Sequence, residues 1–387
     1  MAQTGVLERG AIGALAGAAV GDAIGGATEG RSPEQIRQRY GGPVTGIVGP
    51  FVLDWRTARP HAPYHKGDGH VTDDTLMTNL LVRVYADKRD HLDAYDIDER
   101  LVPLMINERV WIPELETTSV GLQRVFLAEK WLVARLFYGH VDPREAGVGN
   151  IVNCGAAMYS APIGIANAGH PDGAYAEAID IAGAHQSSYG REAAGVFAAT
   201  VAAALRPGAS VETVVGAALR LAKDGTHAAI DAVTDAATRL PAGTIDVTPL
   251  RPVMAPFDTL GEQYRDPGLG ARRPSRIHSI EELPLALGCV VASGGEYRQA
   301  VLAATNYGRD SDSIATMAGA ICGALHGIEA VPKDWRETVA ENSRLDLSAT
   351  GATMAAVARE IFAADRARAA ERESVVAALL DPNGAAA

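Results

Sequence analysis

Two stretches of the sequence carry a glycine or alanine at every fourth position, and this spacing constrains the fold most. Residues 10–27 place Gly13, Gly17, Gly21 and Gly25 in this register, and residues 311–327 place Ala315, Gly319, Gly323 and Gly327. A four-residue repeat falls on one face of a helix, where each glycine costs about 1 kcal/mol relative to alanine. Close approach of another helix or of a ligand to the bare backbone would explain this cost. We therefore predict two bare-faced helices that build one tightly packed centre.

Most of the remaining chain also has helical periodicity. Apolar residues recur with helical spacing in residues 75–88, 174–183, 190–205, 211–223 and 227–238. Alternating β-branched runs and tight hairpin turns, which are the signals of strands, are scarce. Segments 41–70 and 241–276 are rich in Pro, Gly, Arg and His and are expected to form long loops. The pattern as a whole predicts an all-α protein.

The chain shows no internal repeat and no clear linker, so we expect a single catalytic domain. We assign it to residues 1–364, followed by a C-terminal helix and tail at residues 365–387. Residues 100–145 hold Trp111, Trp131 and other aromatic residues among many Glu and Arg residues, which fits a helical insert or lid. The two tryptophans could belong to the core, or they could provide a stacking surface beside the site.

Composition and charge exclude several classes of protein. Hydrophobic residues make up 47% of the chain, which is too many for a disordered protein. The formal net charge of −12 argues against a surface that binds nucleic-acid phosphates. Stretch 10–27 lacks a basic leader and contains Asp22, so we expect neither a signal peptide nor a membrane span. The three cysteines lie far apart and suggest a reducing compartment, so a cytoplasmic protein is predicted.

Two acidic clusters stand out, each directly before a predicted helix. The first is Thr72-Asp73-Asp74-Thr75 and the second is Asp310-Ser311-Asp312-Ser313. Asp, Ser and Thr are preferred helix N-caps, so each cluster alone is explained by capping. A cap needs only one oxygen, however, and neighbouring carboxylates repel each other unless a cation lies between them. Hard cations such as Mg²⁺, Mn²⁺ or Ca²⁺ prefer several oxygen ligands, and two such clusters could hold a pair of ions about 4 Å apart.

Other motifs of metal binding and catalysis fit poorly. His61, His65, Asp68 and His70 lie close in sequence, but their spacing matches no zinc pattern. A solvated loop is the more common explanation for such a segment. The chain also lacks an HExxH motif, a nucleophile elbow and a phosphate loop. Cys154 has no signature of a nucleophile around it and is expected to be a small buried residue.

Five short motifs follow one another over most of the chain. They are the stretch Gly13 to Gly25 with Glu29, the segment Thr72 to Thr75, the segment Cys154 to Met158 with Ala161 to Gly164, the pair Ala184-His185, and the segment Ala304 to Ser313 with the glycine-rich helix after it. In this order they resemble the ADP-ribosylglycohydrolase family, which includes the dinitrogenase-reductase-activating glycohydrolases. Each motif alone is weak, but the series is specific.

The resemblance implies a compact orthogonal helical bundle with a binuclear Mg²⁺ or Mn²⁺ centre. It implies six metal ligands, which are Thr72, Asp73, Asp74, Asp310, Asp312 and Ser313. It assigns catalytic roles to Glu29, Asp73 and Asp310, and substrate contacts to Gly155, Met158, Tyr159 and His185. Glu29 would either protonate the leaving group or position water. Without the resemblance, Glu29 would be a solvated loop residue beside Arg31.

The implied reaction is hydrolysis of the ribosyl glycosidic bond of an ADP-ribosylated protein side chain or an ADP-ribose derivative. Such a bond breaks through an oxocarbenium-like transition state, and metal ions can fix the sugar hydroxyls and activate water. A small nucleoside-like or ribosyl N-glycoside is the alternative substrate. A non-catalytic binding or structural member of the fold is a further alternative, but the chain retains all six candidate ligands.

This sequence departs from the family pattern at two places that bear on the substrate. Cys154-Gly155 stands where relatives commonly have Asn-Gly, and Tyr159 stands where an Arg is common. The loss of an Arg weakens the expectation of a diphosphate-bearing substrate. Basic residues Arg272, Arg273 and Arg276 could compensate, although such a run most often forms a solvated surface.

Overall fold

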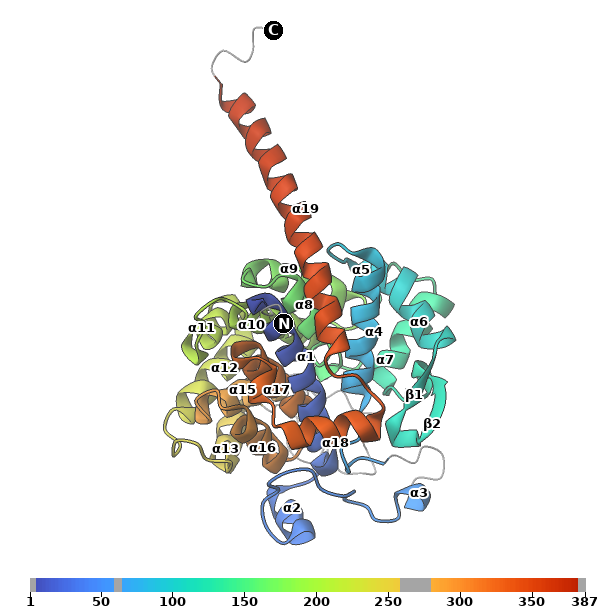
Figure 1. Ribbon diagram of the computed structural model, residues 1–387, viewed down its shortest axis with the longest axis vertical. Helices are drawn as coiled ribbons and strands as arrows, with labels where there is room; N and C mark the ends of the chain where they lie inside the picture. Colours follow the sequence, from blue (N-terminus) through green and yellow to red (C-terminus); the bar gives the residue numbers. More distant parts are fainter. Residues whose placement is uncertain (1–4, 59–64, 258–279, 382–387) are drawn as a thin grey trace.

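Helices α1 (Val6–Gly25) and α17 (Ser311–His326) form the centre of the protein and run antiparallel. The computed structural model describes residues 5–58, 65–257 and 280–381. Within these ranges, α1 and α17 contact each other more extensively than any other pair of elements. Figure 1 shows α1 near the middle of the molecule, between the elements of segment 100–145 on one side and helices α11 (Val211–Leu221), α12 (Asp224–Ala237) and α15 (Glu282–Ala292) on the other.

The glycine spacing predicted this contact, and the structure confirms it. A Cβ atom at Gly13, Gly17, Gly21 or Gly25 would lie 2.2–2.4 Å from the carbonyl oxygen of Gly323, Gly319, Ala315 or Ser311, respectively. Real Cβ atoms do not approach backbone oxygens this closely, so the two helices require glycine in α1 along the whole contact. The reverse holds for α17, where a Cβ atom at Gly323 would lie 2.0 Å from the oxygen of Gly13. Of the two explanations for the glycine stripe, a neighbouring helix is the correct one.

The regular secondary structure of the described residues is almost entirely helical. After α1 come α2 (Pro33–Tyr40), α3 (Trp55–Ala58), α4 (Asp73–Lys88), α5 (Ala94–Asp96), α6 (Val102–Asn107), α7 (Leu127–Leu132), α8 (Ala161–Ala166), α9 (Pro171–Gly183), α10 (Ser188–Ala204), α11 (Val211–Leu221), α12 (Asp224–Ala237) and α13 (Arg251–Met254). On either side of α17 lie α15 (Glu282–Ala292), α16 (Tyr297–Tyr307), α18 (Lys333–Ser343) and α19 (Ala349–Leu380). The all-α prediction and the five predicted helical segments are confirmed to within a few residues.

Segment 100–145 differs from the helical insert that we expected. It contains an antiparallel hairpin of β1 (Arg109–Ile112) and β2 (Thr117–Val120), with Arg109 opposite Val120 and Ile112 opposite Thr117. The turn between the strands begins at Pro113 and carries none of the tight-turn dipeptides that signal a hairpin in a sequence. Short strands with such a turn resemble loop sequence, which is why they were missed.

The predicted loops and the C-terminal helix also need correction. Segment 41–70 contains the short helix α3, and the described part of segment 241–276 contains α13 with 3₁₀ turns beside it. Helix α19 begins at Ala349, so residue 365 lies inside one continuous helix rather than at its start. Its buried residues end at Ile361, and the exposed remainder projects away from the body of the protein (Figure 1).

Stretch Val6–Thr28 is long and apolar enough to cross a membrane by length and composition. Nearly all of it is buried inside the protein, as expected for the core helix of a globular fold. Helix α19 also packs on it, because Gly351 lets the backbone of α19 approach Ile12 closely. The observed packing thus accounts for the apolar character of this stretch.

We predict that Gly323→Ala destabilises the protein by about 2–3 kcal/mol or more, because the added methyl group overlaps the oxygen of Gly13 and neither backbone can move. The measurement is the free energy of unfolding from denaturant titration. Gly216→Ala is the matched control, because Gly216 lies within helix α11 with no atom within 4 Å of its would-be Cβ. This control should gain about 0.4–1 kcal/mol. Equal stabilities of the two variants would contradict the close packing of α1 and α17.

Candidate metal centre and active site

The N-termini of α4 and α17 meet beside the last turn of α1, where the carboxylate of Asp22 is fully buried. One oxygen of Asp22 accepts hydrogen bonds from the Thr72 hydroxyl (2.6 Å), and the other accepts from the Thr72 amide (2.9 Å), the Thr75 amide (3.2 Å) and the Thr75 hydroxyl. Asp22 therefore fixes the start of α4 against α1. The close packing of α1 and α17 brings the start of α17 to the same place.

Helix capping does not explain the two acidic clusters. Neither Thr72 at the start of α4 nor Asp310 at the start of α17 makes a side-chain hydrogen bond to its own helix as a cap. Asp22 instead accepts from the first amides of α4. The carboxylates of both clusters are thus available for another role.

Three carboxylates of the two clusters converge with Asp22 and Glu29 in two groups that could each hold a metal ion. Oxygen atoms of Asp22, Asp74 and Asp312 lie within 4.8 Å of one another, and the same is true of Glu29, Asp310 and Asp312. Asp312 belongs to both groups, as expected for a ligand that bridges two ions. The Oδ1 atom of Asp74 is buried and has no hydrogen-bond partner in the structure. The donor set consists of oxygens, which suits hard divalent cations.

Glu29 reaches the site from the loop after α1. Two backbone hydrogen bonds hold this loop. The amide of Gly30 donates to the carbonyl oxygen of Arg309 (2.6 Å), and the amide of Arg309 donates to the carbonyl oxygen of Arg31 (3.0 Å). Gly308 permits this approach, because its φ is 72° and a Cβ atom there would lie 2.1 Å from the oxygen of Arg31. The position of Glu29 is therefore built into the structure rather than left to a free loop.

Two basic side chains lie among these carboxylates. The Lys66 ammonium contacts Glu29 and donates to Oδ2 of Asp312 at 2.9 Å, so it lies within the second carboxylate group. The Arg124 guanidinium lies 3.3 Å from Oδ1 of Asp73 and also pairs with Glu114. Asp73 is thus held by Arg124 and belongs to neither of the two groups of converging oxygens.

Burial and mutual repulsion shift the pKa values of these acids. Burial raises the pKa of Asp22 to about 6 and that of Asp310 to about 8, with a further contribution from the nearby charge of Asp312. Burial and Asp312 also raise the pKa of Asp74 well above its usual value. Burial would raise the pKa of Asp312 as well, but the Lys66 ammonium lowers it. The raised pKa values of Asp22, Asp74 and Asp310 thus mean that the protein's own basic groups do not balance the negative charge of these acids when they are ionised.

Cys154 lies at the edge of the site. It is buried, as expected, but its thiol donates to Oδ2 of Asp310 (3.2 Å) and contacts Oγ of Ser313 (3.3 Å). Burial and the charge of Asp310 raise the pKa of this thiol well above its usual value. A protonated thiol of this kind is a hydrogen-bond donor and a poor nucleophile.

The predicted substrate-binding residues form a buried group next to the carboxylates. Tyr159 and His185 are almost fully buried, and the Tyr159 hydroxyl lies 3.0 Å from Nδ1 of His185. Glu129 of α7 lies 3.5 Å from Nε2 of His185, and a Cβ atom at Gly155 would lie 2.4 Å from Oε1 of Glu129. Met158 is also buried. Tyr159, His185 and Glu129 thus form a chain of contacts that ends at Gly155.

Burial raises the pKa of Glu129 to about 8, with help from the charge of Asp73, and lowers the pKa of His185 to about 3. The histidine is therefore neutral, and both groups remain uncharged over much of the physiological range. Segment 100–145 thus supplies Glu129, which lies beside His185, and Arg124, which lies beside Asp73.

The two tryptophans of the insert contact protein groups and are not fully buried. Both are half-buried: the Trp111 ring stacks on Arg344 (3.7 Å), and the Trp131 indole donates to the oxygen of Ala146 (3.0 Å). Arg272, Arg273 and Arg276, which could compensate for the missing Arg of the family pattern, lie outside the described residues. The same is true of His61.

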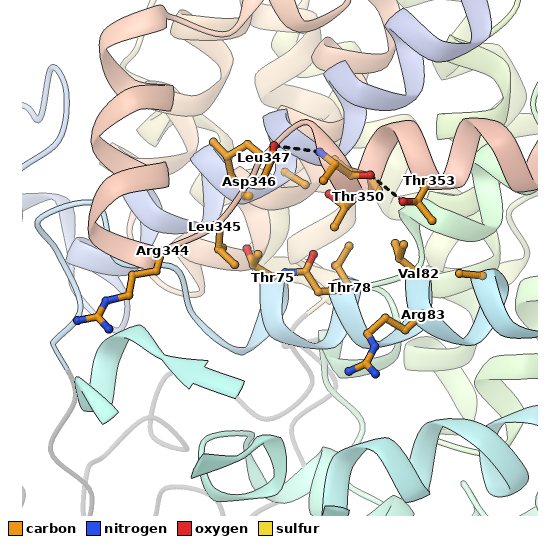
Figure 2. A pocket seen from close by; sticks show the side chains of 16 residues that line it. Thr75, Thr78, Val82, Arg83, Arg344, Leu345, Asp346, Leu347, Thr350 and Thr353 are labelled. Atoms are coloured by element: carbon orange, nitrogen blue, oxygen red, sulfur yellow. Dashed lines mark hydrogen bonds between the residues drawn. The ribbon is translucent and has the colours of Figure 1, made fainter. Parts of the chain in front are cut away.

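A separate pocket of about 320 Å³ opens between α4 and the start of α19. Figure 2 shows Thr75 and Thr78 on one side of this pocket and Thr350 and Thr353 on another. None of the converging carboxylates is among its described lining residues. Thr75 links the two features, because its hydroxyl donates to Asp22.

Four residues of the site were missed by sequence reasoning. Asp22 had a signal, since it is a single acid inside an apolar, glycine-rich helix, but we used it only against a membrane span. Lys66, Arg124 and Glu129 had no signal, because each lies among other charged or polar residues and reaches the site only through tertiary packing.

The chain is similar to several known proteins. The family model of ADP-ribosylglycohydrolase matches residues 3–371. An uncharacterised protein of Archaeoglobus fulgidus is 28% identical over 362 residues, covering 87% of this chain and 93% of the relative. ADP-ribosylarginine hydrolase Tri1 of Pseudomonas putida is 27% identical over 338 residues, covering 85% and 74%.

A solved structure described as an ADP-ribosylglycohydrolase-related protein complex has the same fold. Its TM-score is 0.57 at 21% identity, and the match covers 91% of this chain and 99% of that chain. At this identity the likeness supports the helical fold alone. The family model, which spans nearly the whole chain, goes further: this protein is a hydrolase that belongs to the ADP-ribosylglycohydrolase family.

Proposed function

We propose that the protein hydrolyses the ribosyl glycosidic bond of ADP-ribosylated side chains or ADP-ribose derivatives, with two Mg²⁺ or Mn²⁺ ions as cofactors. The observation that carries the proposal is the convergence of two carboxylate groups that share Asp312, with a buried and unpartnered oxygen on Asp74. Two ions held here would supply Lewis-acid stabilisation of the sugar and a more acidic bound water.

The ligands we propose are the carboxylates of both clusters together with the hydroxyls of Thr72 and Ser313. Asp74 and Asp312 are the strongest candidates, because they belong to the converging groups and are buried. In this proposal Thr72 keeps its hydrogen bond to Asp22, so Asp22 orients a ligand. Asp73 is held by Arg124, so its proposed catalytic role depends on the position of this arginine.

Glu29 is the proposed acid or water-positioning group. Its side chain is partly exposed, and its loop is tied to Arg309, the residue directly before Asp310. In the structure its carboxylate contacts Lys66. A carboxyl group at this position can donate a proton to the leaving group or hold a water molecule for attack.

Gly155 stays a proposed substrate contact, although its lack of a side chain is explained by Glu129, whose Oε1 would lie 2.4 Å from a Cβ atom there. Tyr159, His185 and Glu129 form a buried polar group that sets the shape of the site. The substrate class rests on the family and on relatives such as an ADP-ribosylarginine hydrolase. Tyr159 is buried against His185, so a base-stacking role, on which the nucleoside alternative partly rests, gains no support.

We predict turnover of at least one ADP-ribosyl compound in a panel of ADP-ribosyl-arginine, ADP-ribosyl-serine, O-acetyl-ADP-ribose and several nucleosides, assayed with Mg²⁺ or Mn²⁺. Asp74→Asn and Asp312→Asn should each lower kcat/KM at least about 100-fold, since each 1.4 kcal/mol of lost transition-state stabilisation is tenfold in rate. Asp235→Asn, on the exposed surface of α12, is the matched control and should retain activity. Turnover of nucleosides alone would contradict the proposed substrate class, and full activity of both variants would contradict the proposed centre.

Metal binding should also couple to pH in a defined direction. The folded-state pKa values of Asp22 (about 6) and Asp310 (about 8) lie above the unfolded value of 3.8. The folded metal-free protein therefore binds more protons than the unfolded chain between pH 4 and 8, and its stability falls as pH rises through this window. A bound cation reverses this penalty by favouring the ionised carboxylates.

We predict that Mg²⁺ or Mn²⁺ raises the thermal unfolding midpoint, and that the increase is larger at pH 8 than at pH 6. The measurement is thermal unfolding with and without the ion at both pH values. The Asp74→Asn, Asp312→Asn double variant serves as the control and should lose most of the increase. An increase of equal size at both pH values would contradict the assignment of the ions to these acids.

A further inference from the structure

A second cluster of possible metal ligands lies outside the carboxylate centre. One ring nitrogen each of His65 and His70 and one carboxylate oxygen of Glu116 lie within 4.8 Å of one another. The two imidazole rings are 4.2 Å apart between centroids, and Nδ1 of His65 lies 2.9 Å from Oε1 of Glu116. The cluster joins the segment before α4 to the turn between β1 and β2.

The hydrogen bonds around the cluster orient both histidines as they are oriented in metal sites. Nε2 of His65 donates to Oδ2 of Asp68 (2.7 Å), which leaves Nδ1 facing Glu116. Nδ1 of His70 donates to the carbonyl oxygen of Gly67 (2.9 Å), which leaves the lone pair of the neutral ring on Nε2. Histidine ligands typically donate their second ring nitrogen to a carboxylate or a backbone carbonyl in this way.

The backbone that carries these residues is strained. Gly67, Asp68 and Gly69 have φ values of 122°, 53° and 81°, and Glu116 has a φ of 48°. Left-handed conformations at non-glycine residues such as Asp68 and Glu116 cost of order 1–3 kcal/mol each and concentrate at functional sites. Here they fold His70 back over Gly67, where its amide donates to the oxygen of Gly67 (3.0 Å), and they direct Glu116 at His65.

The chemistry of the donors separates this cluster from the carboxylate centre. Imidazole nitrogens suit zinc and neighbouring transition metals, whereas Mg²⁺ and Mn²⁺ prefer oxygen donors. Two histidines and one glutamate form a known set of three protein ligands for Zn²⁺, with water in the fourth position. Arg56 pairs with the other oxygen of Glu116, which leaves Oε1 directed at the cluster.

We propose that His65, His70 and Glu116 bind a single transition-metal ion, with Zn²⁺ as the best match, at a site distinct from the proposed Mg²⁺ or Mn²⁺ centre. The ion takes the position of the proton that Nδ1 of His65 shares with Glu116, and this proton is released to solvent. The backbone amide of His65 also donates to the oxygen of Glu114 at 2.8 Å. The ion therefore fastens the segment that carries Lys66 to the hairpin of the insert.

The test measures metal content rather than activity. Full-length protein is stripped with a chelator, loaded with Zn²⁺ in the presence of excess Mg²⁺, dialysed, and analysed for zinc by mass spectrometry. We expect one zinc ion per chain, and Co²⁺ in its place should give the strong visible absorption of a four-coordinate site. Glu116→Gln and His70→Gln should weaken zinc binding more than Asp68→Asn, which orients a ligand and should cost about 10–100-fold.

Two controls make the outcome decisive. Asp74→Asn removes an acid of the carboxylate centre and should retain the zinc ion, as should His227→Ala, which changes an exposed histidine on α12. Glu116 is partly exposed, so its variant tests the proposal even if His70→Gln fails to fold. The proposal is overturned if the wild-type protein retains no zinc, if Glu116→Gln retains all of it, or if Asp74→Asn loses it instead.

Discussion

The close approach of the α1 and α17 backbones is the constraint on which the rest of the structure depends. Because the two helices run antiparallel with glycine at the contact, the last turn of α1 lies beside the first turn of α17. Asp22 and Asp312 are thereby brought together deep inside the protein, and Asp22 also holds the start of α4 through Thr72 and Thr75. A site formed at the ends of three tightly packed helices is rigid, as a metal centre requires.

The same packing creates an electrostatic problem that the site must solve. Several carboxylates are removed from water, which raises the pKa values of Asp22, Asp74 and Asp310. The N-termini of α4 and α17 favour negative charge, and Lys66 and Arg124 neutralise part of it. Divalent cations would neutralise the remainder, so the cost of burying these acids and the proposed affinity for metal have one physical cause. The chain belongs to a family of glycohydrolases, and such a centre fits that chemistry.

Sequence reasoning succeeded where a residue's role follows from its local pattern. The glycine spacing predicted the α1–α17 contact, and adjacent acids at two helix starts predicted the two clusters that the structure brings together. It failed where the role depends on tertiary placement. Arg124 and Glu129 come from an insert whose charged residues resemble a solvated surface, and its hairpin has a turn without the usual signature. Zinc was not expected because the spacing of His61, His65, Asp68 and His70 matches no zinc pattern. Glu116, the third ligand of the zinc site that we propose, is far from these histidines in sequence.

The central claim is that two divalent cations lie between the starts of α4 and α17 and share Asp312. Anomalous diffraction from crystals grown with Mn²⁺ tests it most directly, because manganese is located independently of any assumption about its ligands. We expect two anomalous peaks, one beside Asp74 and one beside Asp310, with the Lys66 ammonium displaced from between Glu29 and Asp312. A map without peaks at this place, with Lys66 still bridging these two acids, would contradict it.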